Sequence, residues 1–129
     1  MNSVNGAIVM NVQIQIDRLF KLLSDKNRLR IINLLLYKEL CVCEIEDIIQ
    51  TTQTNISHHL AKLTMAGILH QRKQGQWVYY KIDEDFIDRN TLLINYLKNA
   101  FGLDELFKND IEKITNAITH ESVVNKRCK

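Results

Sequence analysis

The segment that decides the fold spans residues 41–82, "CVCEIEDIIQTTQTNISHHLAKLTMAGILHQRKQGQWVYYKI". Its apolar residues follow a helical spacing twice, first over residues 41–50 and then from Thr51 or Thr52 to residue 67. The period then changes to two, in the runs "ILHQRK" and "WVYYKI", which the turn "QGQ" joins. Two short helices separated by the polar residues "QTT" and followed by a β-hairpin are the plan of a winged helix-turn-helix.

Helical spacing also dominates on both sides of this segment. A first amphipathic helix is predicted from Val12 to about Ser24, and a second one, "NRLRIINLLLY", is capped by Ser24 or Asp25. Beyond residue 83, apolar residues mark one broken helix or two, with Gly102 as the expected break. The predicted fold is therefore mainly α with a small β-hairpin: four helices, the hairpin and one or two further helices, in a dimer.

Length and composition indicate a single ordered domain. The chain has 129 residues, of which 46% are hydrophobic and 25% are charged. No apolar run is long enough to span a bilayer, so we expect a cytoplasmic protein. We predict a flexible leader at residues 1–10, a DNA-binding and dimerisation domain at residues 11–120, and a flexible tail at residues 121–129.

The charges are distributed unevenly along the chain. Residues 48–82 contain no Asp or Glu but four cations, so this segment carries +4 and leaves −2 for the rest of a chain with a net charge of +2. A solvated basic face is the ordinary explanation of such a run, and DNA becomes the better one because the basic residues lie in a winged helix-turn-helix pattern.

The second helix of the motif offers polar side chains near its N-terminal end, the end that enters a major groove. Amides there can pair with adenine, hydroxyls can serve bases or phosphates, and cations at the hairpin tip can reach the DNA backbone. In contrast, His59 is expected to be a packed or hydrogen-bonded core residue, and the aromatic residues of the hairpin are expected in the core of the sheet. The candidate DNA-binding residues are Gln53, Thr54, Asn55, Ser57, His58, Lys62, Arg72, Lys73 and Gln76.

Residues 25–82 as a whole resemble the ArsR/SmtB family of metal-responsive bacterial repressors. The resemblance lies in "NRLRII", "TNISHHLAKL" and "GQWVYYKI", and "ELCVCE" resembles the thiol motif of the arsenical-sensing branch. It implies a homodimer that binds double-stranded DNA at an inverted repeat and is released by a thiophilic ion. It also implies that no cofactor is required and that the inducer is trivalent arsenic or antimony, or another soft metal ion.

The candidate metal ligands are the three cysteines, Cys41, Cys43 and Cys128. Three cysteines are an odd and sparse set, which fits reduced thiols better than a disulfide framework. Cys128 is either a third ligand or a dispensable tail residue, and Glu46 stands where family members with a complete triad carry their third cysteine. Residues 86–118 contain no histidine, so the family's other metal site, built from His and Asp on the C-terminal helix, is expected to be absent.

The spacing of the first two cysteines suggests a switch. Residues two apart on an α-helix point about 200° away from each other, so Cys41 and Cys43 are expected to share an ion only if their helical turn unwinds. That distortion would disturb the DNA-reading helix packed against it. A position near a helix N-terminus is also expected to lower the pKa of both thiols.

Three other functions compete with this prediction. The cysteines could form a disulfide or persulfide redox switch, or serve a thiol enzyme, although the chain has neither a glycine-rich phosphate loop nor a nucleophile motif, so we expect no enzyme. The C-terminal helices could alternatively form a protein-binding module. We expect them to build the dimer interface with the first helix, because Val12, Leu19, Phe101 and Phe107 would otherwise lack partners.

Overall fold

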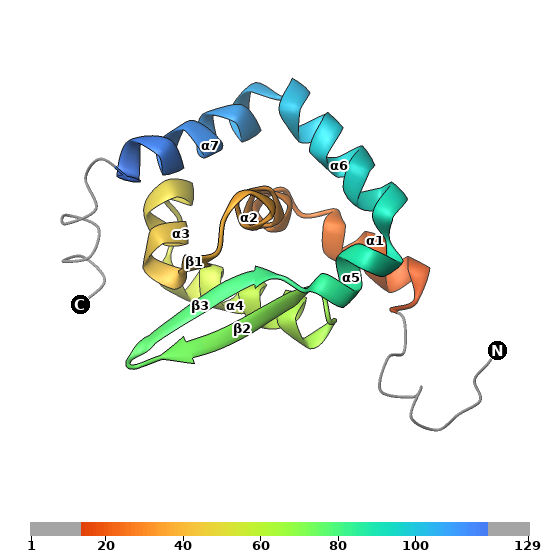
Figure 1. Ribbon diagram of the computed structural model, residues 1–129, viewed down its shortest axis with the longest axis horizontal. Helices are drawn as coiled ribbons and strands as arrows, with labels where there is room; N and C mark the ends of the chain where they lie inside the picture. The colour runs from red at the N-terminus through yellow and green to blue at the C-terminus, as the bar shows by residue number, and fades with distance from the viewer. Residues whose placement is uncertain (1–13, 119–129) are drawn as a thin grey trace.

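The computed structural model describes residues 14–118 as seven helices and three short strands (Figure 1). The winged helix-turn-helix architecture predicted from the sequence is confirmed. The predicted leader and tail, as well as Val12 and Cys128, lie outside the described residues. The helices are α1 (Ile16–Leu23), α2 (Lys26–Tyr37), α3 (Val42–Ile49), α4 (Gln53–Met65), α5 (Glu84–Arg89), α6 (Thr91–Leu103) and α7 (Glu105–Ile118), and the strands are β1 (Leu40–Cys41), β2 (Leu69–Gln74) and β3 (Trp77–Ile82).

Helix α2 is the centre of the molecule. Figure 1 shows it nearly end-on, surrounded by the other helices, and it contacts α1, α3, α4, α6, α7 and β3. Asp25 begins the helix by accepting a hydrogen bond from the backbone N–H of Arg28 at 3.0 Å, which satisfies one amide of the first turn. Because α2 is covered on several sides, Ile31, Ile32 and Leu34 are at most 2% exposed.

The turn between α3 and α4 sets the position of the predicted reading helix. Gln50 ends α3 in the left-handed conformation, with φ 59°. Thr52 then caps α4, since its hydroxyl accepts from the backbone N–H of Asn55 at 3.1 Å. The predicted start of this helix is therefore confirmed at Thr52, and α4 packs directly on α3.

The hairpin belongs to a three-stranded antiparallel sheet in the order β1-β3-β2. Gly75, with φ 63°, lies in the turn between β2 and β3. Strand β1 was not predicted, because a strand of two residues is too short to show a period. Its pairing places Cys41 opposite Tyr79, which in turn lies opposite Arg72 of β2.

The C-terminal helices differ from the prediction in two respects. The short helix α5 precedes α6, and the break after α6 falls at Asp104 rather than at Gly102, which lies inside the last turn of α6. Asp104 has an extended backbone, with φ −103° and ψ 126°, and its side chain accepts from the backbone N–H of Leu106 at 3.0 Å. The carboxylate that begins α7 therefore makes the break, and a glycine is not needed.

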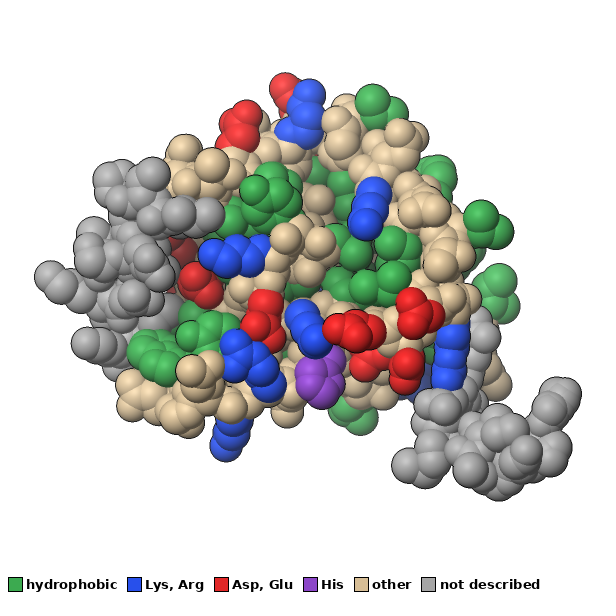
Figure 2. Space-filling view, in the orientation of Figure 1, with side chains coloured by type: hydrophobic (Ala, Val, Ile, Leu, Met, Phe, Trp, Pro, Cys, Tyr) green, Lys and Arg blue, Asp and Glu red, His purple; other side chains and the backbone are tan. Residues whose placement is uncertain are grey.

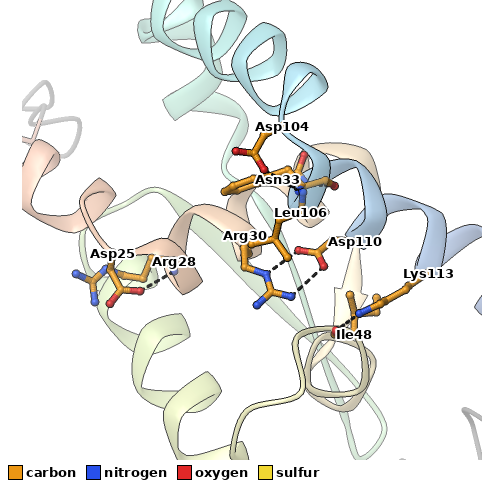
Figure 3. Close-up of polar contacts among 10 residues, drawn as sticks. Asp25, Arg28, Arg30, Asn33, Ile48, Asp104, Leu106, Asp110 and Lys113 are labelled. Atoms are coloured by element: carbon orange, nitrogen blue, oxygen red, sulfur yellow. Dashed lines mark hydrogen bonds and ion pairs between the residues drawn. The ribbon is translucent and has the colours of Figure 1, made fainter.

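Helix α7 folds back onto α2 and α3 through buried polar contacts (Figure 3). The guanidinium of Arg30 donates to both carboxylate oxygens of Asp110, at 2.7 and 2.9 Å, and the Asp110 side chain is fully buried. Asn33 of α2 donates to the carbonyl of Phe107 at 3.0 Å, and Lys113 donates to the carbonyl of Ile48 at 3.3 Å. The last contact joins α7 to the C-terminal end of α3.

Helices α6 and α7 form an arch over one side of α2. A cavity of about 470 Å³ lies among these three helices, and Figure 2 shows hydrophobic side chains in the hollow under the arch. Phe101 and Phe107 stack beside it, with ring centroids 4.8 Å apart. No helix within residues 14–118 is long and apolar enough to cross a membrane.

The reasoning that led to the predicted dimer interface is wrong in part. Leu19, Phe101 and Phe107 are only 6–7% exposed because the chain's own helices cover them. A different apolar set is left on the outside of α1 and α6: Ile16, Phe20, Leu92, Tyr96 and Leu103, which are 57–85% exposed.

Candidate metal centre and nucleic-acid interface

Cys41 and Cys43 lie side by side where β1 meets α3. Cys41 is the last residue of β1 and the N-cap of α3, with an extended backbone (φ −91°, ψ 168°), while Cys43 lies in the first turn. Their Sγ atoms are 3.7 Å apart. The predicted need to unwind the helix is therefore wrong, because Cys41 lies outside the helix and the 200° rotation between helical neighbours does not apply to it.

This spacing fits two ligands of one soft ion. Two thiolates bound tetrahedrally, with bonds of about 2.3 Å, have their sulfur atoms about 3.8 Å apart. Cys43 is disulfide-bonded in this structure, whereas the Sγ atom of Cys41, at 3.7 Å, is too far away to be bonded to it. Binding of an ion by both sulfur atoms consequently requires reduced Cys43.

Among the described residues, no third ligand lies beside this pair. Between residues 14 and 118 no group of three or more His, Cys, Asp or Glu side chains comes together in a way that could hold a metal ion. Glu44, the nearest carboxylate in sequence, has one oxygen engaged at 2.9 Å by the backbone N–H of Cys41. The candidate third ligand, Cys128, lies outside the described residues.

The predicted lowering of both thiol pKa values is wrong for Cys41. Its side chain is buried, and burial raises the pKa of the Cys41 thiol to about 11, an effect that the negative charge of Glu44 adds to. Hydrogen bonds from the backbone of Glu44 and Cys43 act in the opposite direction but are outweighed. The Cys41 thiol is protonated at neutral pH, so a metal ion must displace a proton to bind there.

The DNA-binding candidates on α4 share an exposed face. Gln53, Thr54, Asn55, Ser57, His58 and Lys62 are all exposed, whereas Ile56, Leu60 and Leu63 of the same helix are fully buried. The side-chain amide of Asn55 donates to the Thr51 hydroxyl at 3.1 Å, so part of its hydrogen-bonding capacity is used within the protein. The helix therefore presents a polar N-terminal half to solvent and an apolar face to the core.

His59 is buried, as the sequence predicted, and it ties α4 to the junction of α1 and α2. Its side chain is 10% exposed, with Nδ1 3.1 Å from Nη1 of Arg28 and Nε2 3.8 Å from the carboxylate of Asp25. Arg28 also donates to the carbonyl of Leu22 at 2.7 Å. Burial lowers the pKa of His59, and the positive charge of Arg28 lowers it further, although Asp25 partly opposes both effects.

The hairpin presents its candidate residues, Arg72, Lys73 and Gln76, on an exposed surface. Arg72, however, already has an acidic partner, Glu39. The Arg72 Nε and Nη2 atoms each lie 2.9 Å from a Glu39 carboxylate oxygen, and its guanidinium carbon lies 4.6 Å from the centre of the Tyr79 ring. The hydrogen bonds from Arg72 hold the pKa of Glu39 below its usual value.

The sequence does not reveal the role of Glu39, because residues 48–82, which contain the hairpin, hold no Asp or Glu and Glu39 lies nine residues before them. Its position is explained by β1, which brings the residues before Cys41 alongside the wing, the hairpin of β2 and β3. The only sequence signal for β1 is the apolar pair "LC" between two predicted helices, and two residues are too few to identify a strand.

Comparisons with known proteins agree with this architecture. The profile described as "Bacterial regulatory protein, arsR family" matches residues 25–71. The chain is 48% identical over 64 residues to the arsenic resistance transcriptional regulator ArsR1 of Pseudomonas putida, a match that spans 49% of this chain and only 50% of that protein. It is 44% identical over 87 residues to the cadmium resistance transcriptional regulatory protein CadC of Listeria innocua, covering 67% of this chain and 68% of that protein.

Solved structures show the same fold. The transcriptional repressor BigR from Xylella fastidiosa superimposes with a TM-score of 0.60 at 29% identity, covering 70% of this chain and 86% of that one. The homodimeric winged helix-turn-helix domain Mb0332 from Mycobacterium bovis gives a TM-score of 0.57 at 26% identity, covering 76% and 88%. The chain therefore belongs to the ArsR family of bacterial regulatory proteins, which are DNA-binding winged-helix transcription regulators and not enzymes.

Proposed function

We propose that this protein is a repressor that leaves its operator when Cys41 and Cys43 bind a soft thiophilic ion. The observation that carries the proposal is the 3.7 Å separation of the two Sγ atoms at the start of α3, the helix that packs on α4. Thiolates prefer soft ions to hard ones. Relatives named as arsenic and cadmium resistance regulators support arsenite or Cd²⁺ as inducers, and antimonite is a further candidate as a thiophilic ion.

The residues have separate roles in this proposal. The exposed polar residues at the start of α4 read base edges in the major groove, and Lys62 and Lys73 contact phosphates. Ile45 and Ile48, buried on α3, transmit a change at the thiols to α4 through direct packing. A coupling of the usual size for allosteric proteins, about 1–3 kcal/mol, would weaken DNA binding roughly 5- to 150-fold.

In this proposal the protein binds an inverted repeat as a homodimer. The exposed apolar residues of α1 and α6 supply a surface suited to a two-fold interface, since an isolated monomer would leave them in water. Two reading helices related by such an axis can enter successive major grooves, roughly 34 Å apart. The homodimeric state named for Mb0332 supports this assembly.

The direct test is fluorescence anisotropy of reduced protein on the DNA upstream of its gene, before and after addition of arsenite, antimonite or Cd²⁺. We expect binding at moderate salt and release by at least one soft ion. Cys41→Ser and Cys43→Ser are expected to bind the DNA but resist release, and Cys128→Ser tests the third ligand. Release of both Cys41→Ser and Cys43→Ser at the wild-type ion concentration would contradict the proposal.

A redox sensor is a second candidate function, and the disulfide-bonded form of Cys43 favours it. In that case oxidation of the thiols, and not an ion, would release the DNA. The two candidates are separated by measuring DNA affinity after mild oxidant and after arsenite. Release by oxidant alone would replace the ion-sensing proposal with the redox one.

A further inference from the structure

The wing cation Arg72 is linked to the thiol site through one row of the sheet. Cys41 of β1, Tyr79 of β3 and Arg72 of β2 lie directly opposite one another across the three strands. Residues that face each other across antiparallel strands project their side chains on the same side of the sheet. The Arg72 guanidinium accordingly lies over the Tyr79 ring, 4.6 Å from its centre.

Glu39 is the acidic partner of Arg72. The carboxylate accepts two hydrogen bonds of 2.9 Å from the Nε and Nη2 atoms, and Nη1 donates to the side chain of Gln74 at 2.7 Å. Three of the five N–H groups of the guanidinium are thus used within the protein, and its charge is balanced. In this arrangement Arg72 cannot offer the same fork of donors to a phosphate.

We infer that Glu39 withholds Arg72 from DNA, and that Arg72 exchanges the Glu39 carboxylate for a DNA phosphate when the duplex binds. The pair is exposed enough to make this exchange feasible, since the side chains of Arg72 and Glu39 are 43% and 29% exposed. Glu39 immediately precedes β1, the strand that contains Cys41, so an ion on Cys41 and Cys43 acts next to the carboxylate and favours the paired state. The inference rests on the proposed function, to which it adds a residue that regulates the wing.

The test compares four forms of the reduced, ion-free protein: wild type, Glu39→Gln, Arg72→Ala and the double variant. Glu39→Gln is expected to bind operator DNA up to about fivefold more tightly, the ratio that corresponds to the stabilisation of an exposed ion pair. Adding Arg72→Ala to Glu39→Gln is expected to remove that gain. Arg72→Ala is also expected to lower the slope of log affinity against log salt by about 0.9, as the loss of one phosphate contact does.

A matched control separates this effect from simple removal of a negative charge. Glu84 also forms an exposed ion pair near the hairpin, with Lys81 at 3.0 Å, so Glu84→Gln removes the same charge without freeing Arg72. We expect little change in the affinity of Glu84→Gln for DNA. An equal gain in Glu84→Gln, a gain that persists in the Glu39→Gln/Arg72→Ala variant, or weaker binding by Glu39→Gln would overturn the inference.

The link to the thiols is tested by adding the ion that releases the wild type. The fold-loss of DNA affinity is expected to be smaller in Glu39→Gln, because the ion pair between Glu39 and Arg72 that the ion favours can no longer form. An equal fold-loss would disprove that link. If the wild type fails to bind DNA or to respond to any ion, the proposed function itself is wrong. If the wild type does both, but the effects of Glu39→Gln and Arg72→Ala on DNA affinity simply add in the double variant, only the role of Glu39 is refuted.

Discussion

Cys41 acts as both a strand residue and a helix cap, and this double position explains the geometry of the thiol pair. Its extended backbone turns the side chain toward Cys43, which lies in the first turn of α3, so that the two Sγ atoms are 3.7 Å apart. Burial keeps its thiol protonated at neutral pH, with a pKa of about 11. A single residue outside the helix thus makes a chelating pair possible without a change in the helix.

His59 gives a prediction for the pH dependence of stability. Its pKa is lowered in the folded protein, with Asp25, Arg28, His58 and Lys62 as the charged or titratable groups around it. The unfolded chain then binds a proton more readily, so the contribution of neutral His59 is complete above pH 6.5 and is lost as the pH falls through its folded pKa. Asp25, whose pKa is lowered from 3.8, affects a more acidic range.

The measurement is urea denaturation at pH 7.5 and pH 5.5 for the wild type and His59→Gln. The wild type is expected to lose free energy of unfolding between the two values, while His59→Gln loses less. His58, which is exposed on the same helix, supplies the control His58→Gln, which should behave like the wild type. An identical pH dependence in His59→Gln would contradict this role of the buried histidine.

Among the elements, α7 helps to fix the position of α3. It is joined to α2 by the Arg30–Asp110 pair and to the end of α3 by the hydrogen bond from Lys113 to Ile48 (Figure 3). The thiols lie at the other end of α3. Helix α3, which packs on the proposed reading helix, is therefore held at one end by α7 and carries the thiol pair at the other.

We expect Asp110→Ala to lower the free energy of unfolding by about 3–5 kcal/mol, because it leaves Arg30, only 13% exposed, without its partner. Urea denaturation measures this loss. The control is Lys108→Ala on the same helix, which breaks the exposed Lys108–Glu105 pair and should cost no more than about 1 kcal/mol. Similar losses in the two variants would show that the buried pair does not anchor α7.

The elements with a clear period were predictable from the sequence, and the short ones were not. Apolar spacing identified α2, α3, α4 and the hairpin, and capping chemistry indicated Thr52 as one of two candidate starts for α4. The strand β1 has only two residues and shows no period, so its effects were missed. These effects are the proximity of Cys41 to Cys43 and the pairing of Glu39 with Arg72, which depend on contacts between distant segments.

At the scale of the whole molecule, the exposed apolar residues of α1 and α6 form an apolar surface that a single chain leaves uncovered. Leu92 and Tyr96 of α6 are 85% and 68% exposed, and Phe20 of α1 is 57% exposed. A dimer built on this face would leave α4 and the wing free for DNA. The proposed inverted-repeat recognition depends on this assembly.

Tyr96→Glu is expected to shift the protein from dimer to monomer at micromolar concentration, because it places a charge among the exposed apolar residues of α6. Analytical ultracentrifugation reports the shift, and DNA affinity should fall with it. Met65→Glu is the matched control, since Met65 is 81% exposed on α4, which is not one of the two helices of the proposed interface. A wild type that sediments as a monomer, or a Tyr96→Glu variant that remains dimeric, would exclude this interface.

Hydrogen–deuterium exchange of the reduced protein with and without saturating arsenite tests the central claim most directly, with the Cys41→Ser/Cys43→Ser variant as a control. The account predicts slower exchange at residues 40–44 and unchanged or slower exchange at residues 45–49, together with loss of DNA affinity. Faster exchange at residues 45–49 would mean that α3 unwinds to bind the ion. That result would contradict a thiol pair already placed for chelation at the start of an intact helix.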